Sequence, residues 1–208
     1  MRCFSFIVRY RFAFAVLALA AGLIAAGLCN SSGAHAAEKD SIPSYGEGAW
    51  ELMIFTDYFC GPCGFAEKYL DPELERLLAK GDIKITFIDY PGHGKSTALY
   101  AKYFLEAIAA EKGYKNAMKA RRILFALAGE GKTREETAVK EALKAQGVTL
   151  KKTDPTPVYA QWSTMIKRFD VRQTPTCILR FSSTYSKRFG DAQKITDELI
   201  PELQKRFP

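Results

Sequence analysis

A pair of cysteines at the start of a helical pattern is the feature that most constrains this chain. The sequence CGPC occupies residues 60–63, directly after an apolar and aromatic segment, residues 50–56, that is typical of a buried strand. Apolar residues then recur at helical spacing over 63–80. Free backbone N–H groups and the helix dipole stabilise negative charge at such a position, and so favour the nucleophilic thiolate of Cys60. The pattern predicts a redox pair in which the more exposed Cys60 attacks and the shielded Cys63 resolves the mixed disulfide.

Two other interpretations of the pair remain open at this point. One is an inert pair, buried or bridged at the helix start, and the other is part of a copper or zinc site. A metal site would need Cys177 or His93 as further ligands beside Cys60 and Cys63. Cys177 lies in a predicted core strand, where we expect it to be a buried, apolar residue. A redox pair, by contrast, needs no bound cofactor.

The first 36 residues have the organisation of an export signal. Three arginines in the first eleven residues precede an apolar run over 12–29, and the tripeptide Ala-His-Ala at 34–36 follows it. We predict cleavage after Ala36 and a periplasmic location, where disulfides persist. The apolar run is 18 residues long, which is enough to cross a bilayer. An uncleaved anchor therefore remains an alternative, and it would be the chain's only contact with a membrane.

The charge of the chain argues against a nucleic-acid partner. The full sequence has 30 basic and 23 acidic residues, a net charge of +7, and residues 1–36 contain three of the basic residues and no acid. The mature chain would then carry 27 − 23 = +4, which is too weak a charge to favour nucleic acid. Basic clusters such as residues 119–122 are expected on solvated helix faces.

The remaining pattern separates a sheet-forming part from a block of helices. Residues 37–49 are expected to be an irregular leader, and Pro72 to kink the helix over 63–80 or to begin a second segment. A strand over 83–90 should lie parallel to the first strand, because a helical crossover joins them. The other predicted elements are helices at 96–111, 114–128, 133–146 and 156–169, a strand at 176–181, its hairpin partner at 186–191, and a closing helix capped by Asp191 and disturbed at Pro201.

A Thr-Pro dipeptide lies between the last long helix and the strand at 176–181. X-Pro bonds adopt the cis form more often than other peptide bonds. We predict a cis bond between Thr174 and Pro175 at this loop-to-strand junction. Such a bond would turn backbone polar groups outward, where they can pair with an extended peptide.

These elements together resemble the thioredoxin superfamily. The matching features are the strand at 50–56, the CGPC pair with its helix, the next strand, the Thr-Pro junction, the hairpin and the final helix. The helical block makes the chain similar to the DsbA-type periplasmic disulfide oxidoreductases. The resemblance implies an α/β protein, a thioredoxin fold with an inserted helical domain. Its divisions would be a signal peptide (1–36), the first part of the thioredoxin fold (37–90), the helical insertion (91–154) and the second part of the thioredoxin fold (155–208).

The resemblance also implies roles for individual residues. Cys60 would be the attacking cysteine and Cys63 the resolving one, with the cis-proline facing them. Thr174, before that proline, would tune redox behaviour. The implied substrate-binding residues are Thr174, Pro175, Gly61, Pro62, Tyr58 and Phe59, of which the last two would line an apolar groove for unfolded substrate.

Two departures from the family pattern leave the direction of electron flow open. Thioredoxins and many DsbA-like proteins have a buried acid six residues before the first cysteine, where this chain has Ile54. A proton relay would then come from elsewhere, come from water, or be absent. The dipeptide between the cysteines is Gly-Pro, as in reducing thioredoxins, whereas the helical block is typical of oxidants.

The sequence as a whole predicts an exported enzyme that exchanges disulfides with reduced or misoxidised exported proteins in oxidative protein folding. A membrane redox partner is expected, and no cofactor or nucleic acid. The alternatives are a reductant or isomerase of the same chemistry, a copper- or zinc-binding module that uses Cys60, Cys63 and Cys177, and a chaperone-like groove for unfolded chains.

Overall fold

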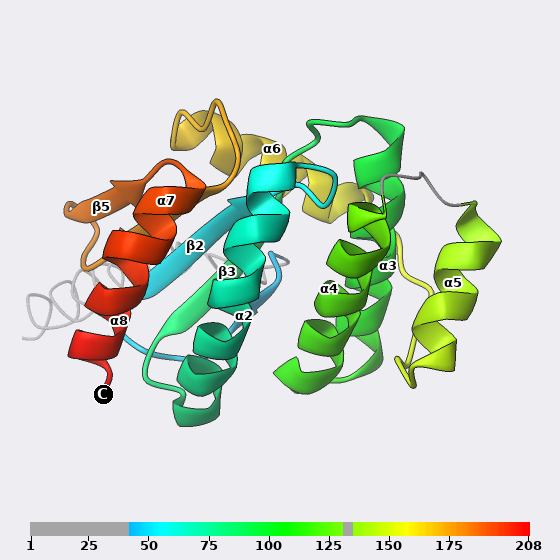
Figure 1. Ribbon diagram of the computed structural model, residues 1–208, viewed down its shortest axis with the longest axis horizontal. Coiled ribbons are helices and arrows are strands. Elements are labelled where there is room, and N and C mark those ends of the chain that lie inside the picture. The colour runs from blue at the N-terminus through cyan, green and yellow to red at the C-terminus, as the bar shows by residue number, and fades with distance from the viewer. Residues whose placement is uncertain (1–41, 131–134) are drawn as a thin grey trace, which may run out of the picture. The chain divides into compact units, whose positions relative to one another are not determined.

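A central β-sheet organises the part of the chain that the structure describes, residues 42–130 and 135–208 of a computed structural model (Figure 1). Its strands lie in the order β1-β3-β2-β4-β5. β2 and β3 are parallel, as predicted, and the other neighbouring strands are antiparallel. The strands are β1 (Ser44–Tyr45), β2 (Glu51–Thr56), β3 (Lys84–Asp89), β4 (Thr176–Arg180) and β5 (Ser186–Phe189).

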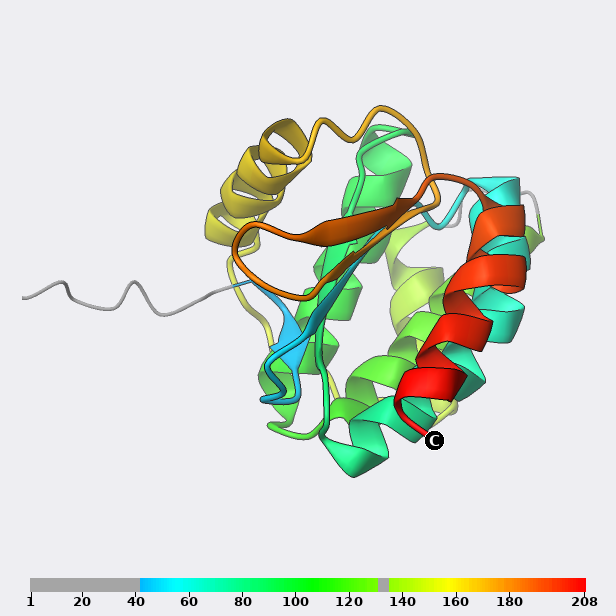
Figure 2. The same ribbon diagram turned by 90° about the vertical axis from the view of Figure 1, so that its left-hand side faces the viewer.

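Helices cover both faces of this sheet. On one face lie α2 (Gly61–Lys80) and the C-terminal run of α7 (Ala192–Lys194), the π-helical segment η1 (Ile195–Leu199) and α8 (Ile200–Arg206). α6 (Thr156–Arg168) lies on the opposite face, as Figure 2 shows. The connection from β3 to α6 contains α3 (Lys95–Ala110), α4 (Tyr114–Gly129) and α5 (Glu136–Ala145), and α4 lies beside both α2 and α3.

Alternate residues of β2 face opposite sides of the sheet, and each side has its own apolar core. Leu52 and Ile54 pack in the cluster that contains the buried residues of α2 and α4, whereas Met53 and Phe55 pack in a second cluster with Trp162 of α6. Every residue of β2 is buried. The central strand is therefore held rigidly on both faces, and its C-terminal end leads directly into the CGPC segment.

One expectation about local structure is wrong, and one alternative at Pro72 is excluded. Residues 44–45 are not part of an irregular leader, because they form the edge strand β1, antiparallel to β3. A strand of two residues has no alternation that a sequence pattern could reveal. Of the two outcomes expected at Pro72, a second segment does not begin there, because α2 runs from Gly61 through Pro72 to Lys80.

The end of the chain follows the prediction. Asp191 caps the closing helical run, where its side chain accepts a hydrogen bond of 2.8 Å from the backbone N–H of Lys194. The π-helical segment η1 precedes Pro201, where we expected a disturbed helix.

Some predictions concern residues outside the described ranges. These are the signal segment 1–36 and the first two residues of the helix expected at 133–146. The described residues belong to one unit, Asp40–Pro208, and the division of the chain at 90 and 154 stays a prediction. Within 42–130 and 135–208, no helix combines the length and the apolar character that a membrane span requires.

Candidate active site

The turn between β2 and α2 holds Cys60 at the point where the helix begins. Cys60 is the N-cap residue of α2. Its backbone N–H donates to the carbonyl oxygen of Asp57 (3.1 Å), and its own carbonyl oxygen accepts from the N–H of Gly64 (3.1 Å). Cys60 is half-buried, whereas Cys63, one turn further along, is fully buried. This is the pattern of exposure that the spacing of the two cysteines predicted.

The two thiols differ strongly in acidity. Both are free in this structure. The pKa of Cys60 is lowered to about 6, chiefly because its sulfur shares a hydrogen bond with Cys63, and partial burial opposes this only in part. That hydrogen bond and burial raise the pKa of Cys63 well above the ordinary thiol value. At neutral pH the thiolate therefore resides on Cys60, beside the positive end of the α2 dipole, which makes it the more nucleophilic sulfur.

The loop before β4 lies against the Cys60 sulfur. The peptide bond between Thr174 and Pro175 is cis, as predicted. The Cys60 thiol donates a hydrogen bond of 3.3 Å to the carbonyl oxygen of Thr174. Thr176, the first residue of β4, anchors the loop through a hydrogen bond from its hydroxyl group to the carbonyl oxygen of Gln173 (2.9 Å). The fold thus brings the two motifs of the sequence together at one sulfur atom.

A groove of about 740 Å³ opens beside Cys60, between the first half of α2 and the last half of α4. We call it the α2–α4 groove. Of the residues expected to contact substrate, Tyr58, Phe59 and Gly61 line it, whereas Pro62, Thr174 and Pro175 are not among its lining residues. The rest of its wall is Cys60, Gly64, Phe65, Glu67, Lys68, Asp71, Pro72, Arg122, Phe125, Ala126, Ala128 and Gly129. Cys60 therefore shares the wall of one groove with aromatic side chains and with several charged ones.

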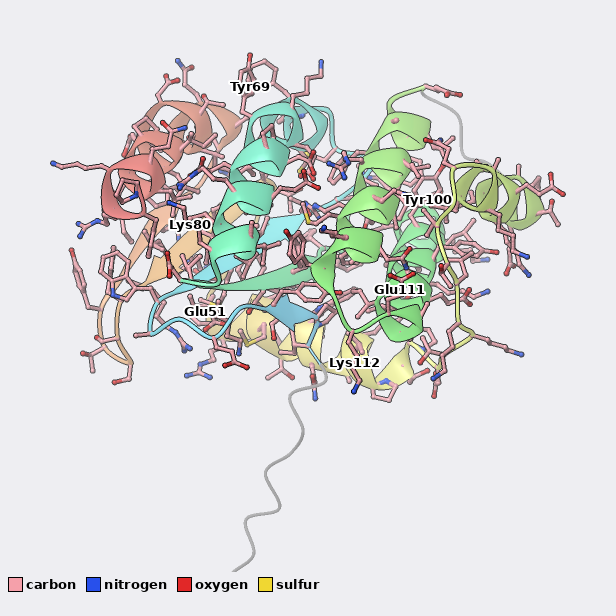
Figure 3. All side chains as sticks on the ribbon, turned by 90° about the horizontal axis from the view of Figure 1, so that it is seen from below. Glu51, Tyr69, Lys80, Tyr100, Glu111 and Lys112 are labelled. Carbon is pink, nitrogen blue, oxygen red and sulfur yellow. The ribbon has the colours of Figure 1, made fainter. Side chains whose placement is uncertain are left out.

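Two large aromatic side chains remain exposed on α2 near this groove. Phe65 is 48% exposed and Tyr69 is 51% exposed, and their ring centroids lie 5.3 Å apart. Figure 3 shows Tyr69 projecting from α2 away from the sheet. Exposed apolar surface of this kind beside a reactive group is typical of a place where another chain binds.

A buried polar cluster beneath the pair was missed by the sequence analysis. Arg121 of α4 is fully buried, although we expected residues 119–122 on a solvated face. Its guanidinium group donates two hydrogen bonds to the carboxylate of Glu67 (2.7 and 2.8 Å) and one to the hydroxyl group of Thr56 (3.2 Å). It also lies over the rings of Phe87 and Phe125, 5.0 and 4.9 Å from their centroids.

The same cluster contains a carboxyl group with an unusual acidity. Asp89, the last residue of β3, is 3% exposed and accepts a hydrogen bond of 3.2 Å from the hydroxyl group of Tyr58. Burial raises the pKa of Asp89 to about 7, although Arg121 and the hydrogen bond from Tyr58 act in the opposite direction. A sequence signal for both residues existed, because Arg121 shares its helix face with buried Ala117 and Leu124, and parallel strands end at the same edge of a sheet.

A second buried acid, Asp57, joins the CGPC turn to the loop after β3. Its carboxylate accepts hydrogen bonds from the backbone N–H groups of Phe59 (2.9 Å) and His93 (3.0 Å), and from the hydroxyl group of Thr97 (3.0 Å). It also contacts Nδ1 of His93 at 2.9 Å. Gly92 makes room for it, because a Cβ atom there would lie 2.6 Å from the carboxylate. Asp57 therefore fixes the turn that presents Cys60.

The third cysteine lies in the core, as expected. Cys177 is fully buried in β4, opposite Ile54 of β2, and burial raises the pKa of its thiol. Ile54 is itself fully buried. Among the residues that the structure describes, no group of three or more His, Cys, Asp or Glu side chains is placed to hold a metal ion. The metal site considered for Cys60, Cys63 and Cys177 has no support in this part of the chain.

The sheet has one parallel pair of strands, β2 and β3, followed by a Cys-x-x-Cys pair at the start of a helix and faced by a cis-proline loop. This combination defines a thioredoxin-like protein. Comparison with known families agrees. A family model described as thioredoxin matches residues 47–195, which is more than half of the sequence, and the chain belongs to this family. No protein with a curated description matches the sequence.

Solved structures confirm the fold at low sequence identity. A periplasmic thioredoxin-like protein from Salmonella enterica serovar Typhimurium has 20% identity and a TM-score of 0.59, over 79% of this chain and 91% of that one. The thiol-disulfide exchange protein α-DsbA2 from Wolbachia pipientis has 17% identity and a TM-score of 0.60, over 81% and 88%. BdbD from Bacillus subtilis, in its oxidised form, has 20% identity and a TM-score of 0.53, over 79% and 94%.

Proposed function

We propose that this protein is an exported thiol–disulfide oxidoreductase that exchanges disulfides with protein substrates through Cys60 and Cys63. The observation that carries the proposal is the arrangement of the pair: a half-buried thiol with a pKa of about 6 at the N-cap of α2, and a fully buried partner one turn away. The names of two similar structures support it, since one is described as periplasmic and another as a thiol-disulfide exchange protein.

The exchange reaction in the oxidising direction follows from this arrangement. A substrate thiolate attacks the sulfur of Cys60 in the Cys60–Cys63 disulfide, and Cys63 leaves with the electron pair of the broken bond and takes up a proton. A second substrate thiolate then attacks the substrate sulfur of the mixed disulfide, and Cys60 leaves as a thiolate. The substrate thiols lose two electrons and two protons: Cys63 takes up one proton, the other goes to the solvent, and the enzyme ends with a thiolate on Cys60 and a thiol on Cys63. The low pKa of Cys60 makes it a good leaving group in the second step.

We propose that the protein oxidises the thiols of its substrates. Stabilisation of the Cys60 thiolate stabilises the reduced protein relative to the disulfide, and that raises the reduction potential of the pair. The substrates would be reduced or misoxidised exported proteins in the periplasm. A membrane redox partner would accept the two electrons and restore the disulfide.

The α2–α4 groove and the cis-proline loop would bind the substrate on the two sides of Cys60. An extended peptide can pair with backbone groups beside Pro175. Its apolar side chains can enter the groove against Phe65 and Phe125, which line it together with Cys60. This arrangement favours unfolded chains, because a folded protein does not offer both an extended backbone and exposed apolar residues.

The reduction potential tests the proposal directly. The protein is equilibrated with glutathione buffers, free thiols are trapped, and the fraction of the Cys60–Cys63 disulfide is measured, with Cys177→Ser as the control that removes the third thiol. A potential closer to about −120 mV than to about −270 mV supports an oxidant, and the reverse supports a reductant. The absence of a reversible two-electron couple would overturn the oxidoreductase proposal.

Trapping of substrates tests the roles of the two cysteines. In Cys63→Ser the resolving thiol is missing, so mixed disulfides with exported proteins should accumulate at Cys60. Cys60→Ser is the matched control, and it should capture none. If Cys63→Ser also captures none, or if capture occurs through Cys63 in the Cys60→Ser protein, the assigned roles are wrong.

A further inference from the structure

The carboxylate of Asp57 lies inside the turn that presents Cys60. It accepts a hydrogen bond from the backbone N–H of Phe59 (2.9 Å), and the carbonyl oxygen of Asp57 accepts one from the backbone N–H of Cys60 (3.1 Å). The pKa of Cys60 is lowered to about 6, chiefly by the hydrogen bond that it shares with Cys63, and the charge of Asp57 opposes this lowering. Asp57 therefore holds the turn in shape but acts against the thiolate on which the exchange reaction depends, and the inference below rests on that proposed function.

His93 is a neighbour of Asp57 that can offset this charge. It lies in the loop between β3 and α3, and its Nδ1 atom is 2.9 Å from Oδ2 of Asp57. Its backbone N–H donates to the same oxygen (3.0 Å), which holds the residue in place. Phe59 and Thr97 supply neutral donors to the carboxylate, whereas an imidazole can carry a positive charge. Because a carboxylate only accepts hydrogen bonds, Nδ1 carries the hydrogen, and Nε2 is the atom that gains the second proton.

The two members of this pair differ in their access to solvent. The side chain of Asp57 is 1% exposed, whereas that of His93 is 51% exposed. Water and salt screen the buried carboxylate poorly, but the imidazole can exchange protons with the solvent. Histidine changes its charge between about pH 5 and 8. The His93 ring also lies 6.0 Å from the ring of Phe59, the residue before Cys60. The pair therefore connects the pH of the solvent with the turn that holds Cys60.

Three titratable groups face the carboxylate of Asp57. They are Cys60 in the turn, Asp89 at the end of β3 and His93 in the loop after β3. α3 contributes a neutral group, the hydroxyl of Thr97. Burial raises the pKa of Asp89 to about 7, so Asp89 also titrates near neutral pH, but its ionisation adds a negative charge. Of these three groups, only His93 can gain a positive charge.

We infer that His93 is a positioning residue that acts on Cys60 through Asp57. In its imidazolium form His93 offsets the charge of Asp57, which stabilises the Cys60 thiolate; in its neutral form that charge acts on the sulfur. When the disulfide is reduced, Cys63 gains one proton, the thiolate remains on Cys60, and the average number of protons on His93 rises at the expense of the solvent. No bond between heavy atoms changes at His93. As the pH falls, the pair therefore becomes a stronger oxidant than the protons of its own thiols would make it.

Alkylation of Cys60 in the reduced protein tests this inference. The rate with iodoacetamide follows the thiolate fraction of Cys60, because Cys63 and Cys177 are fully buried. Rates are measured from pH 5 to 9 in the unaltered protein, in His93→Gln, which is neutral at every pH, and in His93→Lys, which is positive throughout this range. At pH 5.5 we expect His93→Gln to react about threefold more slowly than the unaltered protein, and His93→Lys at least as fast. At pH 9, where Cys60 is fully ionised, His93→Gln and the unaltered protein should agree.

The lysine variant separates an electrostatic role from a structural one. If His93 only donated a hydrogen bond to Asp57, glutamine would replace it at least as well as lysine does. Lys95→Gln is the matched control, because Lys95 is an exposed basic residue at the start of α3, two positions after His93, and this variant should keep the unaltered profile. Asp89 is present in every variant, so its titration does not distinguish them. An unaltered profile in His93→Gln, an equal loss in Lys95→Gln, or a slow His93→Lys overturns the inference.

Reciprocity supplies a second test, on the unaltered protein. If protonated His93 stabilises the Cys60 thiolate, the thiolate must stabilise protonated His93 by the same factor. The imidazole resonances are followed by NMR through a pH titration of the disulfide and dithiol forms, and the only other histidine in the sequence is His35, in the predicted signal segment. The midpoint for His93 should lie about half a pH unit higher in the dithiol form, the equivalent of threefold, and equal midpoints overturn the inference. If no reversible Cys60–Cys63 disulfide forms, the proposed function fails, and the alkylation rates still test His93; if disulfides are exchanged and the profiles do not differ, only the inference about His93 fails.

Discussion

Two buried acids at opposite ends of the central strands, Glu51 and Asp89, differ in how completely they are paired. At the N-terminal end of β2, Glu51 accepts a hydrogen bond from Thr86, forms an ion pair with Arg180 and lies 3.7 Å from the Lys84 ammonium group. At the C-terminal end of β3, Asp89 accepts one hydrogen bond from Tyr58, and its other oxygen is buried with no hydrogen-bond partner among the residues that the structure describes.

We interpret the well-paired acid as a contribution to stability and the poorly paired acid as a feature of the functional site. An acid with ion-pair and hydrogen-bond partners, such as Glu51, contributes to the fold, and removing one partner of a buried pair is costly. An acid with too few partners destabilises the charged form of the protein, and such groups gather at functional sites. The end of the sheet that carries the poorly paired acid is also the end that carries Cys60 and Cys63.

The largest effect should come from removing Arg121, the buried cation of the cluster behind the cysteine pair. We expect Arg121→Met to destabilise the protein by about 3–5 kcal/mol, because Glu67 would be left buried without its partner. Urea unfolding measures this change. The neighbouring Arg122 forms exposed ion pairs with Asp71 and Glu75, so Arg122→Met is the matched control, with an expected loss below about 1 kcal/mol. Equal losses in the two variants would contradict the description of a buried cluster.

A smaller effect should appear in the pH dependence of stability. The folded pKa of Asp89, about 7, lies above its usual value, so the folded state binds the proton more tightly than the unfolded state between these two values. Asp89 therefore makes the protein lose stability as pH rises from about 4 to about 7, by an amount on the order of 3 kcal/mol.

Asp89→Asn should abolish this loss and make the protein more stable than the unaltered protein at pH 8. Unfolding by urea at a series of pH values measures both curves. A variant that is less stable by the same amount at every pH would show that Asp89 is fully paired, like Glu51, and that the contrast between the two ends of the sheet is false.

At the other end of the sheet, we expect that substitution of the buried acid lowers the stability of the protein, whereas Asp89→Asn should raise it at pH 8. Glu51→Gln should lower the free energy of unfolding at pH 7 by about 1–3 kcal/mol, because Arg180 and the hydroxyl group of Thr86 lose a charged partner. Thermal unfolding at pH 7 measures the loss, and the rate of disulfide exchange, measured in parallel, should be unchanged. A slower exchange in Glu51→Gln would mean that the two ends do not divide stability and function as described.

The smallest effect concerns the surface near Cys60. Replacing both Phe65 and Tyr69, which are half exposed, with serine should slow exchange with an unfolded protein about threefold by removing apolar contact area. Exchange with glutathione disulfide is the reference, because that small, polar reagent gains little from apolar contact, and its rate should change much less. Equal slowing of the two reactions would mean that the substitution perturbs the cysteines themselves.

The sequence predicted those parts of the site that depend on neighbouring residues. The strand before CGPC, the helix after it and the exposure of Cys60 relative to Cys63 all follow from local periodicity and from the geometry of a helix start. The cis bond before Pro175 also has a local cause, since only an X-Pro bond adopts this form readily. The short strand β1 was missed because its pairing with β3 is not local.

Local patterns were misleading where a residue's environment comes from distant segments. Arg121 lies in a basic cluster that resembles a solvated helix face, but its position against Glu67, 54 residues earlier, places it in the core. Asp89 is only the polar end of an apolar strand until the fold places Tyr58 against one of its oxygens.

The sequence by itself thus determined the chemistry of the site, namely a cysteine pair at a helix start opposite a Thr-Pro loop, because these features depend on residue type and short spacing. The tertiary structure alone decided the electrostatics behind that pair. The charge state of a buried carboxyl group depends on which groups surround it and how far water is excluded, and here those groups come from the turn after β2, from α2 and from α4.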